Sequence, residues 1–203
     1  MNIDCNSLVL DYLVHRCYKN TAKALLKDIT KLEQYIYIPP QTKQYIQWTL
    51  LDARKSLIEY IEQGNLVCAF EIIEKNFPVL FEQKDSESIL FKLRCQHFIE
   101  IIRSGSELDA ICYAQKHLKP TNHKLKEQVR EVTALIAYKD PFQSQSKHLL
   151  TQERRQALAQ ELNSTLLGLH QMSHQSSIEK LTKQHVVVNK ELEMIDIKEK
   201  KIK

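Results

Sequence analysis

Apolar residues in the first part of this chain recur with the spacing of one helical face. Side chains at i, i+3, i+4 and i+7 lie on one side of an α-helix, because the helix has 3.6 residues per turn. Two such runs are present, formed by Leu10, Leu13, Val14 and Cys17 and then by Ala22, Leu25, Leu26 and Ile29. We therefore predict two short helices within residues 6–33, capped by Asn6 and Asn20. Helices this short are marginal alone in water, so their apolar faces need a partner.

Proline and glycine divide the rest of the chain into further helices. Pro39-Pro40 cannot continue a helix, so residues 34–41 are predicted to form a linker. Turn signals such as Gly64 and Gly105 separate the apolar stripes that follow. These stripes predict helices within residues 42–63, 65–77, 86–104, 106–118, 124–138, 151–169 and 178–197. Residues 143–150 are polar and predict a loop. Strand-like alternation is absent, so the predicted fold class is all-α, a short helical pair followed by a longer helical array.

The last predicted helix carries a seam of residues, all apolar except one histidine, spaced alternately by three and four. The seam consists of Ile178, Leu181, His185, Val188, Leu192 and Ile195. This spacing is typical of a helix that pairs with another helix, but an amphipathic helix packed on its own domain gives the same pattern. Both readings stay open from the sequence. The charged residues 198–203 predict a frayed tail.

The composition is typical of a soluble protein in a reducing compartment. The 203 residues include only three glycines, as long helices would require, and the net charge of +4 is spread along the chain. A nucleic-acid binder more often gathers its positive charge on one stripe. The five cysteines form no C-x-x-C pair, and their odd number argues against a disulfide framework. No signal peptide or membrane-spanning run is recognisable, so we expect a cytoplasmic and nuclear protein that binds neither nucleic acid nor membranes.

No catalytic constellation is recognisable in the sequence. Phosphate-binding loops of the G-x-x-x-x-G-K-[ST] and G-x-G-x-x-G types and the G-x-S-x-G elbow are absent. His170 and His174 have a metal-ligand spacing, but no third ligand is apparent. Cys112 precedes His117 by five residues, and like Cys95 it lies in an apolar stripe, where a core cysteine is expected rather than a nucleophile. We therefore expect no enzymatic activity, no cofactor and no metal.

Two charged residues, Arg54 and Glu100, interrupt otherwise apolar helices. They have the chemistry of an anion site and a catalytic acid. Buried charges are more often paired, however, so a structural ion pair or hydrogen-bond anchors at the edge of a core are the favoured interpretation.

Lysine and aromatic residues are interleaved within residues 31–48. They are Lys31, Tyr35, Tyr37, Lys43, Tyr45 and Trp48. Such a surface can stack single-stranded nucleic acid. Tyrosine and tryptophan are also favoured anchors of protein interfaces, and two prolines break the segment, so an interface or simple packing is the preferred interpretation.

The N-terminal helical pair contains the run Leu8-Val9-Leu10-Asp11-Tyr12-Leu13, then Tyr18, then Thr21-Ala22. This arrangement resembles the LisH motif, a two-helix dimerisation element. The resemblance implies a LisH motif over residues 4–33. It implies a protein interface formed by Leu10, Leu13, Val14, Tyr18, Thr21, Ala22 and Leu25. The family usually has glycine where this chain has Cys17, and cysteine is strained there if the turn needs a positive φ.

Further hallmarks follow in order along the chain. They are Arg54, Ile58, Gly64, Ala69, Phe77-Pro78, the block from Phe91 to Glu100, Ala134 to Tyr138, Asp140-Pro141, Arg154-Arg155 and Leu162-Asn163. Their order resembles a CTLH domain, implied over residues 42–119, and a CRA region, implied over residues 120–197. The resemblance implies structural or interface roles for Arg54, Ile58, Gly64, Ala69, Phe77, Pro78, Phe91, Phe98, Ile99 and Glu100 in CTLH, and for Tyr138, Asp140, Pro141, Leu162, Leu181, Val188 and Leu192 in CRA.

The family that this chain resembles comprises Ran-binding-protein-M-like proteins and small subunits of the glucose-induced-degradation, or CTLH, ubiquitin ligase. The resemblance implies a non-catalytic scaffold in ubiquitin-dependent degradation, whose last CRA helix folds back near LisH. Its implied partners are other LisH/CTLH/CRA proteins and RING subunits, in a homo- or hetero-oligomer. No RING motif is recognisable in this sequence. The alternative is a LisH/CTLH adaptor outside a ligase, such as a Ran-binding, cytoskeletal or transcriptional co-regulator partner.

Overall fold

The computed structural model describes residues 5–32, 50–83, 86–170 and 172–202. Within these ranges every regular element is a helix and no strand occurs, which confirms the predicted all-α class. The described residues fall into two compact units, one from residues 1–52 and 173–203 and one from residues 53–172. The predicted linker at 34–41 and nearly all of the basic-aromatic segment at 31–48 lie outside the described residues.

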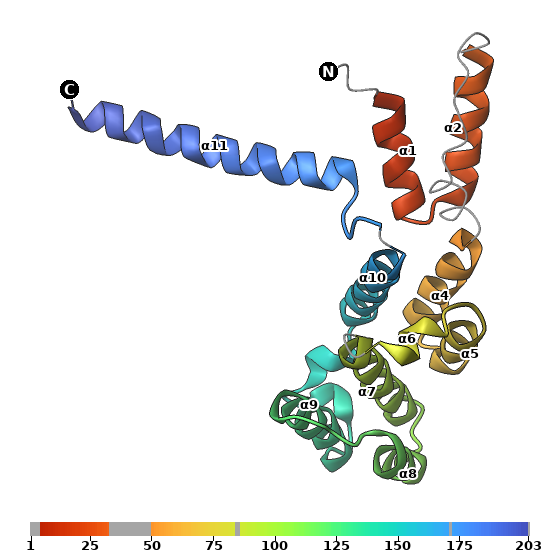
Figure 1. Ribbon diagram of the computed structural model, residues 1–203. Helices are drawn as coiled ribbons and strands as arrows, with labels where there is room; N and C mark the ends of the chain where they lie inside the picture. The colour runs from red at the N-terminus through yellow and green to blue at the C-terminus, as the bar shows by residue number, and fades with distance from the viewer. Residues whose placement is uncertain (1–4, 33–49, 84–85, 171, 203) are drawn as a thin grey trace. The chain divides into compact units, whose positions relative to one another are not determined.

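The first unit contains a helical hairpin and one long helix. Helices α1 (Cys5–His15) and α2 (Lys19–Leu32) form the hairpin, and α11 (Ser177–Ile202) contacts α1 (Figure 1). Both hairpin helices begin one residue before the asparagine that the sequence predicted as the cap. Asn6 and Asn20 therefore lie inside the first turns.

Cys17 makes the turn of the hairpin. Its φ is +60°, and it is the one non-glycine residue with a positive φ in the described ranges. The Cys17 N–H donates to the Val14 carbonyl at 3.2 Å and the Tyr18 N–H donates to the Leu13 carbonyl at 2.8 Å. This pair of bonds is a Schellman motif, which places a left-handed residue just after the helix and usually uses glycine there. The turn therefore needs the positive φ at which a cysteine is strained.

We expect Cys17→Gly to stabilise the first unit by about 1 kcal/mol, because an L-residue in the left-handed region is strained by roughly 1–2 kcal/mol and the lost thiol packing offsets part of the gain. Urea unfolding followed by hydrogen exchange at the α1 and α2 amides measures the change. Cys68→Gly, within helix α5 (Leu66–Asn76) of the second unit, is the matched control. Exchange at the α5 amides is expected to show a loss of about 1 kcal/mol there. A loss of stability in both variants would show that the turn is not strained.

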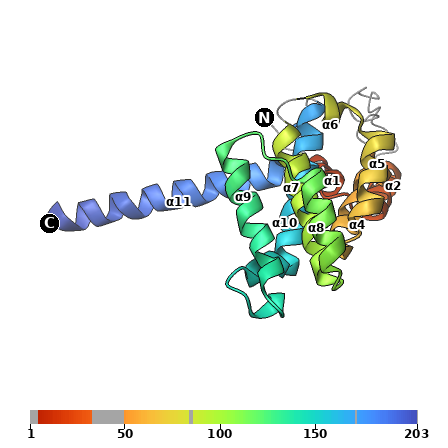
Figure 2. The same ribbon diagram turned by 90° about the horizontal axis from the view of Figure 1, so that it is seen from below.

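The second unit is built around helix α7. Its elements are most of α4 (Leu51–Gln63), α5 (Leu66–Asn76), α6 (Val79–Glu82), α7 (Glu87–Arg103), α8 (Glu107–His117), α9 (His123–Thr133), η2 (Ala134–Ala137), η3 (Pro141–Gln143), η4 (Lys147–Leu150) and α10 (Gln152–Leu169). Helix α7 contacts α5, α6, α8, α9 and α10 (Figures 1 and 2). Nine α7 residues are buried, including Phe91, Phe98 and Ile99. The helix therefore forms the centre of the core.

The turn signals read from the sequence set the helix ends of this unit. Gly64, with φ +80°, ends α4 in a second Schellman motif, and Gly105, with φ +85°, follows α7. The Asn65 side chain caps α5 by accepting from the Cys68 N–H, and Thr151 caps α10 by accepting from the Arg154 N–H. These predictions are confirmed.

Two sequence predictions about helix faces and loops are wrong. Residues 143–150, predicted as loop, contain the short 3₁₀ helix η4, whose Leu149 and Leu150 are buried in the core. A 3₁₀ turn this short shows no 3.6-residue period, so the pattern missed it. In α8, Cys112, which was expected to be a core cysteine, is exposed. Leu108 is 78% exposed as well, whereas Ala110 is fully buried. The helix packs on α7 through a small residue, so the largest apolar side chains do not mark its buried face.

Candidate protein-interaction surfaces

Helix α11 exposes a row of apolar side chains. Every residue from Lys180 to Ile195 is exposed, and within the first unit only the start of the helix lies beside α1 (Figure 1). The predicted seam residues have exposed fractions of 42% at Leu181, 55% at Val188, 54% at Leu192 and 49% at Ile195. Within the first unit, the described residues therefore leave the seam without a partner. A row of exposed apolar side chains on a long helix is typical of an interaction site.

Polar contacts hold the start of α11 against α1. The Ser177 N–H donates to Asp11 Oδ2 at 2.7 Å, and Arg16 Nη2 pairs with Glu179 Oε1 at 2.9 Å. The Ser176 N–H donates to Glu179 Oε2 while the Glu179 N–H donates to the Ser176 hydroxyl, which is a capping box. Burial raises the pKa of Glu179, but the Ser176 backbone bond and the Arg16 charge outweigh it and hold the pKa below its usual value. Glu179 therefore remains an anion at the junction of the two helices.

The predicted LisH residues divide by burial. Val14 and Ala22 are buried, Leu10, Leu13 and Leu25 are half-buried, and Tyr18 and Thr21 are exposed. Tyr18 has an exposed fraction of 53%, and Val9 beside this set has 41%. The hairpin thus keeps part of its apolar face for its own packing and leaves the remainder accessible beside the turn.

The predicted CTLH and CRA residues of the second unit are mostly core residues. Ala69, Phe77, Phe91, Phe98, Ile99 and Leu162 are buried, Ile58, Gly64, Glu100 and Pro141 are half-buried, and Pro78, Tyr138 and Asp140 are exposed. Arg54 is only 1% exposed. The Asp140 side chain accepts from the Phe142 N–H and starts η3. Most of these residues therefore form the core of the unit and are not available on its surface.

Glu100 is the centre of a polar network between α7 and α10. Its Oε1 accepts from Arg155 Nε at 2.8 Å and from Gln96 Nε2 at 2.7 Å, and its Oε2 pairs with Arg155 Nη2. The side chains of Glu100 and Arg155 are 11% and 12% exposed. A side chain at Gly64 would meet the pair, since its Cβ would lie 2.6 Å from Arg155 Nη2. Glu100 thus belongs to a structural ion pair, the kind of role the sequence favoured, but its partner is Arg155, which the sequence did not indicate. The network fastens α10 across α7.

A row of rings runs from α5 over α7 to α8. His97 lies 6.2 Å from Phe70 and 4.6 Å from Tyr113, and Tyr113 lies 4.6 Å from His117, measured between ring centroids. Burial and then the charge of His117 lower the pKa of His97, against an opposite effect of Glu100. Burial likewise raises the pKa of Tyr113 to about 12. The row is therefore neutral near pH 7.

The lowered pKa of His97 predicts a loss of stability in acid. The unfolded chain binds a proton near the ordinary histidine pKa while the folded chain resists it, so the contribution is complete above about pH 6.5 and declines as the pH falls. Between about pH 7.5 and 5.5 the wild type is expected to lose up to about 1 kcal/mol more than His97→Phe, which keeps a ring at this position. Urea unfolding at the two pH values measures this, and an equal loss in both proteins would contradict it.

Two classes of site are missing from the described residues. No group of three or more histidine, cysteine, aspartate or glutamate side chains in those ranges is placed to hold a metal ion. None of the described helices is both long enough and apolar enough to cross a membrane.

Sequence reasoning missed two polar features of these surfaces. The Ser176-x-x-Glu179 capping box was visible as a local motif. The pairing of Glu100 with Arg155 had no local signal, because 55 residues separate the two in sequence.

Comparison with known protein families identifies both the N-terminal hairpin and the helical array that follows it. The LisH family matches residues 5–29, and the family described as "CTLH/CRA C-terminal to LisH motif domain" matches residues 50–193. The second match covers most of the chain. The chain belongs to the LisH–CTLH/CRA family.

The relatives of this LisH–CTLH/CRA protein include two proteins named glucose-induced degradation protein 8 homolog. The one from Dictyostelium discoideum is 27% identical over 81% of this chain and 68% of its own length. The one from Nematostella vectensis is 26% identical over 94% of this chain and 80% of its own length. A Ran-binding protein M homolog from Arabidopsis thaliana is 27% identical over 89% of this chain but only 41% of its own length.

The matched residues can be assigned to individual helices of the structure. The LisH match spans α1 and most of α2, and the CTLH/CRA match extends from α4 into α11. Since one family description covers both CTLH and CRA, the division at residue 119 stays a prediction. The exposed seam of α11 lies largely within the matched region of this LisH–CTLH/CRA protein.

Proposed function

We propose that this chain is a non-catalytic scaffold subunit of a CTLH-type ubiquitin ligase that acts in proteasomal degradation. The observation that carries the proposal is the exposed apolar seam of α11, joined to the LisH hairpin by the Asp11 and Arg16 contacts. The names of its glucose-induced degradation protein 8 relatives support the ligase context. The proposed location is the cytoplasm and nucleus.

The seam has the chemistry of a helix–helix interface. Leu181, Val188 and Leu192 follow one another at intervals of seven and four residues on one face. Burying each of these side chains against another helix contributes roughly 1.5–3 kcal/mol. The proposed partners are a second copy of this chain or another LisH/CTLH/CRA protein, which in turn connects to a RING subunit.

Fractionation of cell extract tests the scaffold role. With the chain present, the RING subunit of the ligase is expected to elute in a high-mass fraction together with this chain. After removal of the chain, the RING subunit is expected to shift to lower mass, and re-expression restores its position. Unchanged elution of the RING subunit would contradict the proposal.

The likeness to a Ran-binding protein M homolog favours one alternative, an adaptor outside any ligase. The adaptor would use the same α11 seam. It predicts that the chain elutes with other LisH/CTLH proteins in fractions that contain no RING subunit, so the same fractionation separates the two functions.

A further inference from the structure

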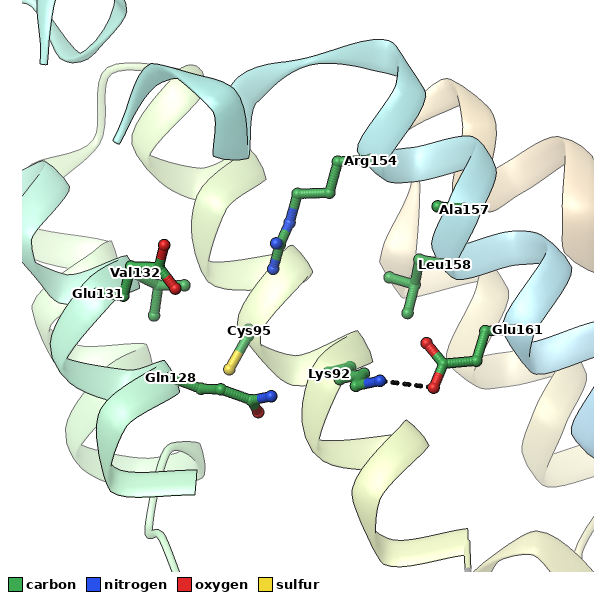
Figure 3. Close-up of a pocket in the computed structure, with 9 residues that line it drawn as sticks. All are labelled: Lys92, Cys95, Gln128, Glu131, Val132, Arg154, Ala157, Leu158 and Glu161. Carbon is green, nitrogen blue, oxygen red and sulfur yellow. Dashed lines mark hydrogen bonds and ion pairs between the residues drawn. The ribbon is translucent and has the colours of Figure 1, made fainter. Parts of the chain in front are cut away.

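A cavity of about 210 Å³ opens between helices α7, α9 and α10 in the second unit. Its residues are Lys92 and Cys95 from α7, Gln128, Glu131 and Val132 from α9, and Arg154, Ala157, Leu158 and Glu161 from α10 (Figure 3). A single water needs only about 10–15 Å³ of such space, so the cavity holds more than one solvent molecule. It is smaller than the roughly 300–1,000 Å³ of pockets that enclose whole drug-sized ligands. A cavity of this volume can hold one amino-acid side chain of a binding partner.

Arg154 brings a cation into this cavity without an ion-pair partner. Figure 3 shows its guanidinium extending from α10 into the space between α9 and α7. Its Nε donates to the neutral amide oxygen of Gln96 at 3.0 Å, and this is the one acceptor that the guanidinium meets among the described residues. The neighbouring Arg155, by contrast, has the carboxylate of Glu100. A half-buried guanidinium without a carboxylate favours an anionic ligand.

The other charged side chains around the cavity have an ion-pair or hydrogen-bond contact of their own. Lys92 pairs with Glu161, and Glu131 lies 3.0 Å from the His148 ring. Glu131 attracts Arg154 through space but lies beyond ion-pair distance from it. Burial raises the pKa of Cys95 to about 11, against a smaller opposite effect of Arg154, so the thiol stays neutral and does not balance the guanidinium. Arg154 is therefore the one cation lining the cavity that has no carboxylate within ion-pair distance among the described residues.

Gln128 supplies an independent polar signal. Its Oε1 is buried and has no hydrogen-bond partner within the described part of the chain. An acceptor buried in this way costs about 1–3 kcal/mol unless a donor reaches it. Figure 3 shows the Gln128 side chain directed across the cavity toward α7. The site therefore offers a donor for an anion and an acceptor for an N–H, with Val132 and Leu158 as apolar walls.

We propose that this cavity binds a glutamate or aspartate side chain of a partner protein, with the carboxylate on Arg154 and a backbone N–H of the same segment on Gln128. The acidic groups Glu131 and Glu161 at the rim disfavour a multiply charged anion such as phosphate and favour a single carboxylate flanked by N–H donors. The choice of a protein ligand rests on the proposed scaffold function. The carboxylate site itself does not depend on it.

The test uses the purified full chain and a blocked amino acid, N-acetyl-glutamate N-methylamide, as the probe. Nitrogen-15 NMR is expected to show saturable shifts at the amides of residues 92–95, 128–132 and 154–158. A ligand of this size is expected to bind with a Kd of about 1 mM. The matched neutral probe, N-acetyl-glutamine N-methylamide, is expected to bind at least about tenfold more weakly, because it cannot form a charge-assisted pair. Because no partner protein is present, the result is independent of any ligase.

Variants separate this site from general charge effects. Arg154→Gln is expected to weaken the glutamate probe at least about tenfold, and Arg130→Gln, the same charge change at an exposed position of α9, is expected to leave it unchanged. Gln128→Leu keeps the fold, since it removes an unpaired buried oxygen, and is expected to weaken the probe several-fold. The absence of saturable shifts, equal binding of the two probes, or equal loss in Arg154→Gln and Arg130→Gln would overturn the proposal.

Discussion

Val188→Glu is expected to weaken self-association of this chain at least about 100-fold. Val188 lies in the middle of the α11 seam and is 55% exposed, so the substitution leaves the folded chain intact. In an associated pair the side chain is buried, and both the lost apolar burial and the desolvation of a carboxylate oppose pairing. A loss of about 2.7 kcal/mol corresponds to 100-fold in affinity. Sedimentation equilibrium across a concentration series measures the change, and circular dichroism verifies the helix content.

Val187→Glu is the matched control for this experiment. Val187 is 59% exposed, so the two positions differ little in accessibility. It is turned by roughly 100° around the helix from Val188 and lies outside the seam. Val187→Glu is therefore expected to change self-association little. Equal weakening in both variants would show that general charge, rather than the seam, controls association.

Glu100→Gln is expected to destabilise the second unit by about 3 kcal/mol. Both carboxylate oxygens of Glu100 accept hydrogen bonds, from Gln96 and Arg155, whereas an amide has only one oxygen. The new amide N–H₂ group would face a donor, and Arg155 would lose its counter-charge in a largely buried place. Removing one member of a buried pair costs about 3–5 kcal/mol. Urea unfolding followed by circular dichroism measures the loss.

Glu59→Gln supplies the exposed comparison. Glu59 lies 3.6 Å from Lys55 on the surface of α4, with side chains 52% and 46% exposed. Exposed i, i+4 pairs contribute about 0.3–0.5 kcal/mol, so this variant is expected to unfold nearly as the wild type does. If Glu100→Gln were as mild as Glu59→Gln, the polar network would not fasten α10 to α7.

Local chemistry made much of the fold predictable. Gly64 and Gly105 adopt the positive φ that a helix end requires, and Asn65 and Thr151 cap the helices that follow them. Each of these features depends on residues within one turn of the helix, so a single sequence contains the full signal.

The buried face of a helix and the contacts between residues far apart in the sequence were harder to predict. Leu108 is exposed while Ala110 is buried, because the packing partner rather than side-chain size selects the face. The partner of Glu100 lies on a different helix, and no spacing in the sequence points to Arg155.

The two candidate sites also differ in whether their signal is local in the sequence. The seam of α11 was predictable because its period is local. Its exposure within the first unit favours a helix that pairs with another helix. The cavity beside Arg154 draws residues from three helices. Only the folded chain brings these side chains together.

Affinity capture from cells, with the tagged wild-type chain and the Val188→Glu variant as parallel baits, tests the central claim most directly. Quantitative mass spectrometry is expected to recover other LisH/CTLH proteins together with a RING subunit on the wild-type bait, and to recover them at least about tenfold less on the variant. Recovery of neither class on the wild-type bait, or equal recovery on both baits, would contradict the account of α11 as the assembly surface of a ligase scaffold.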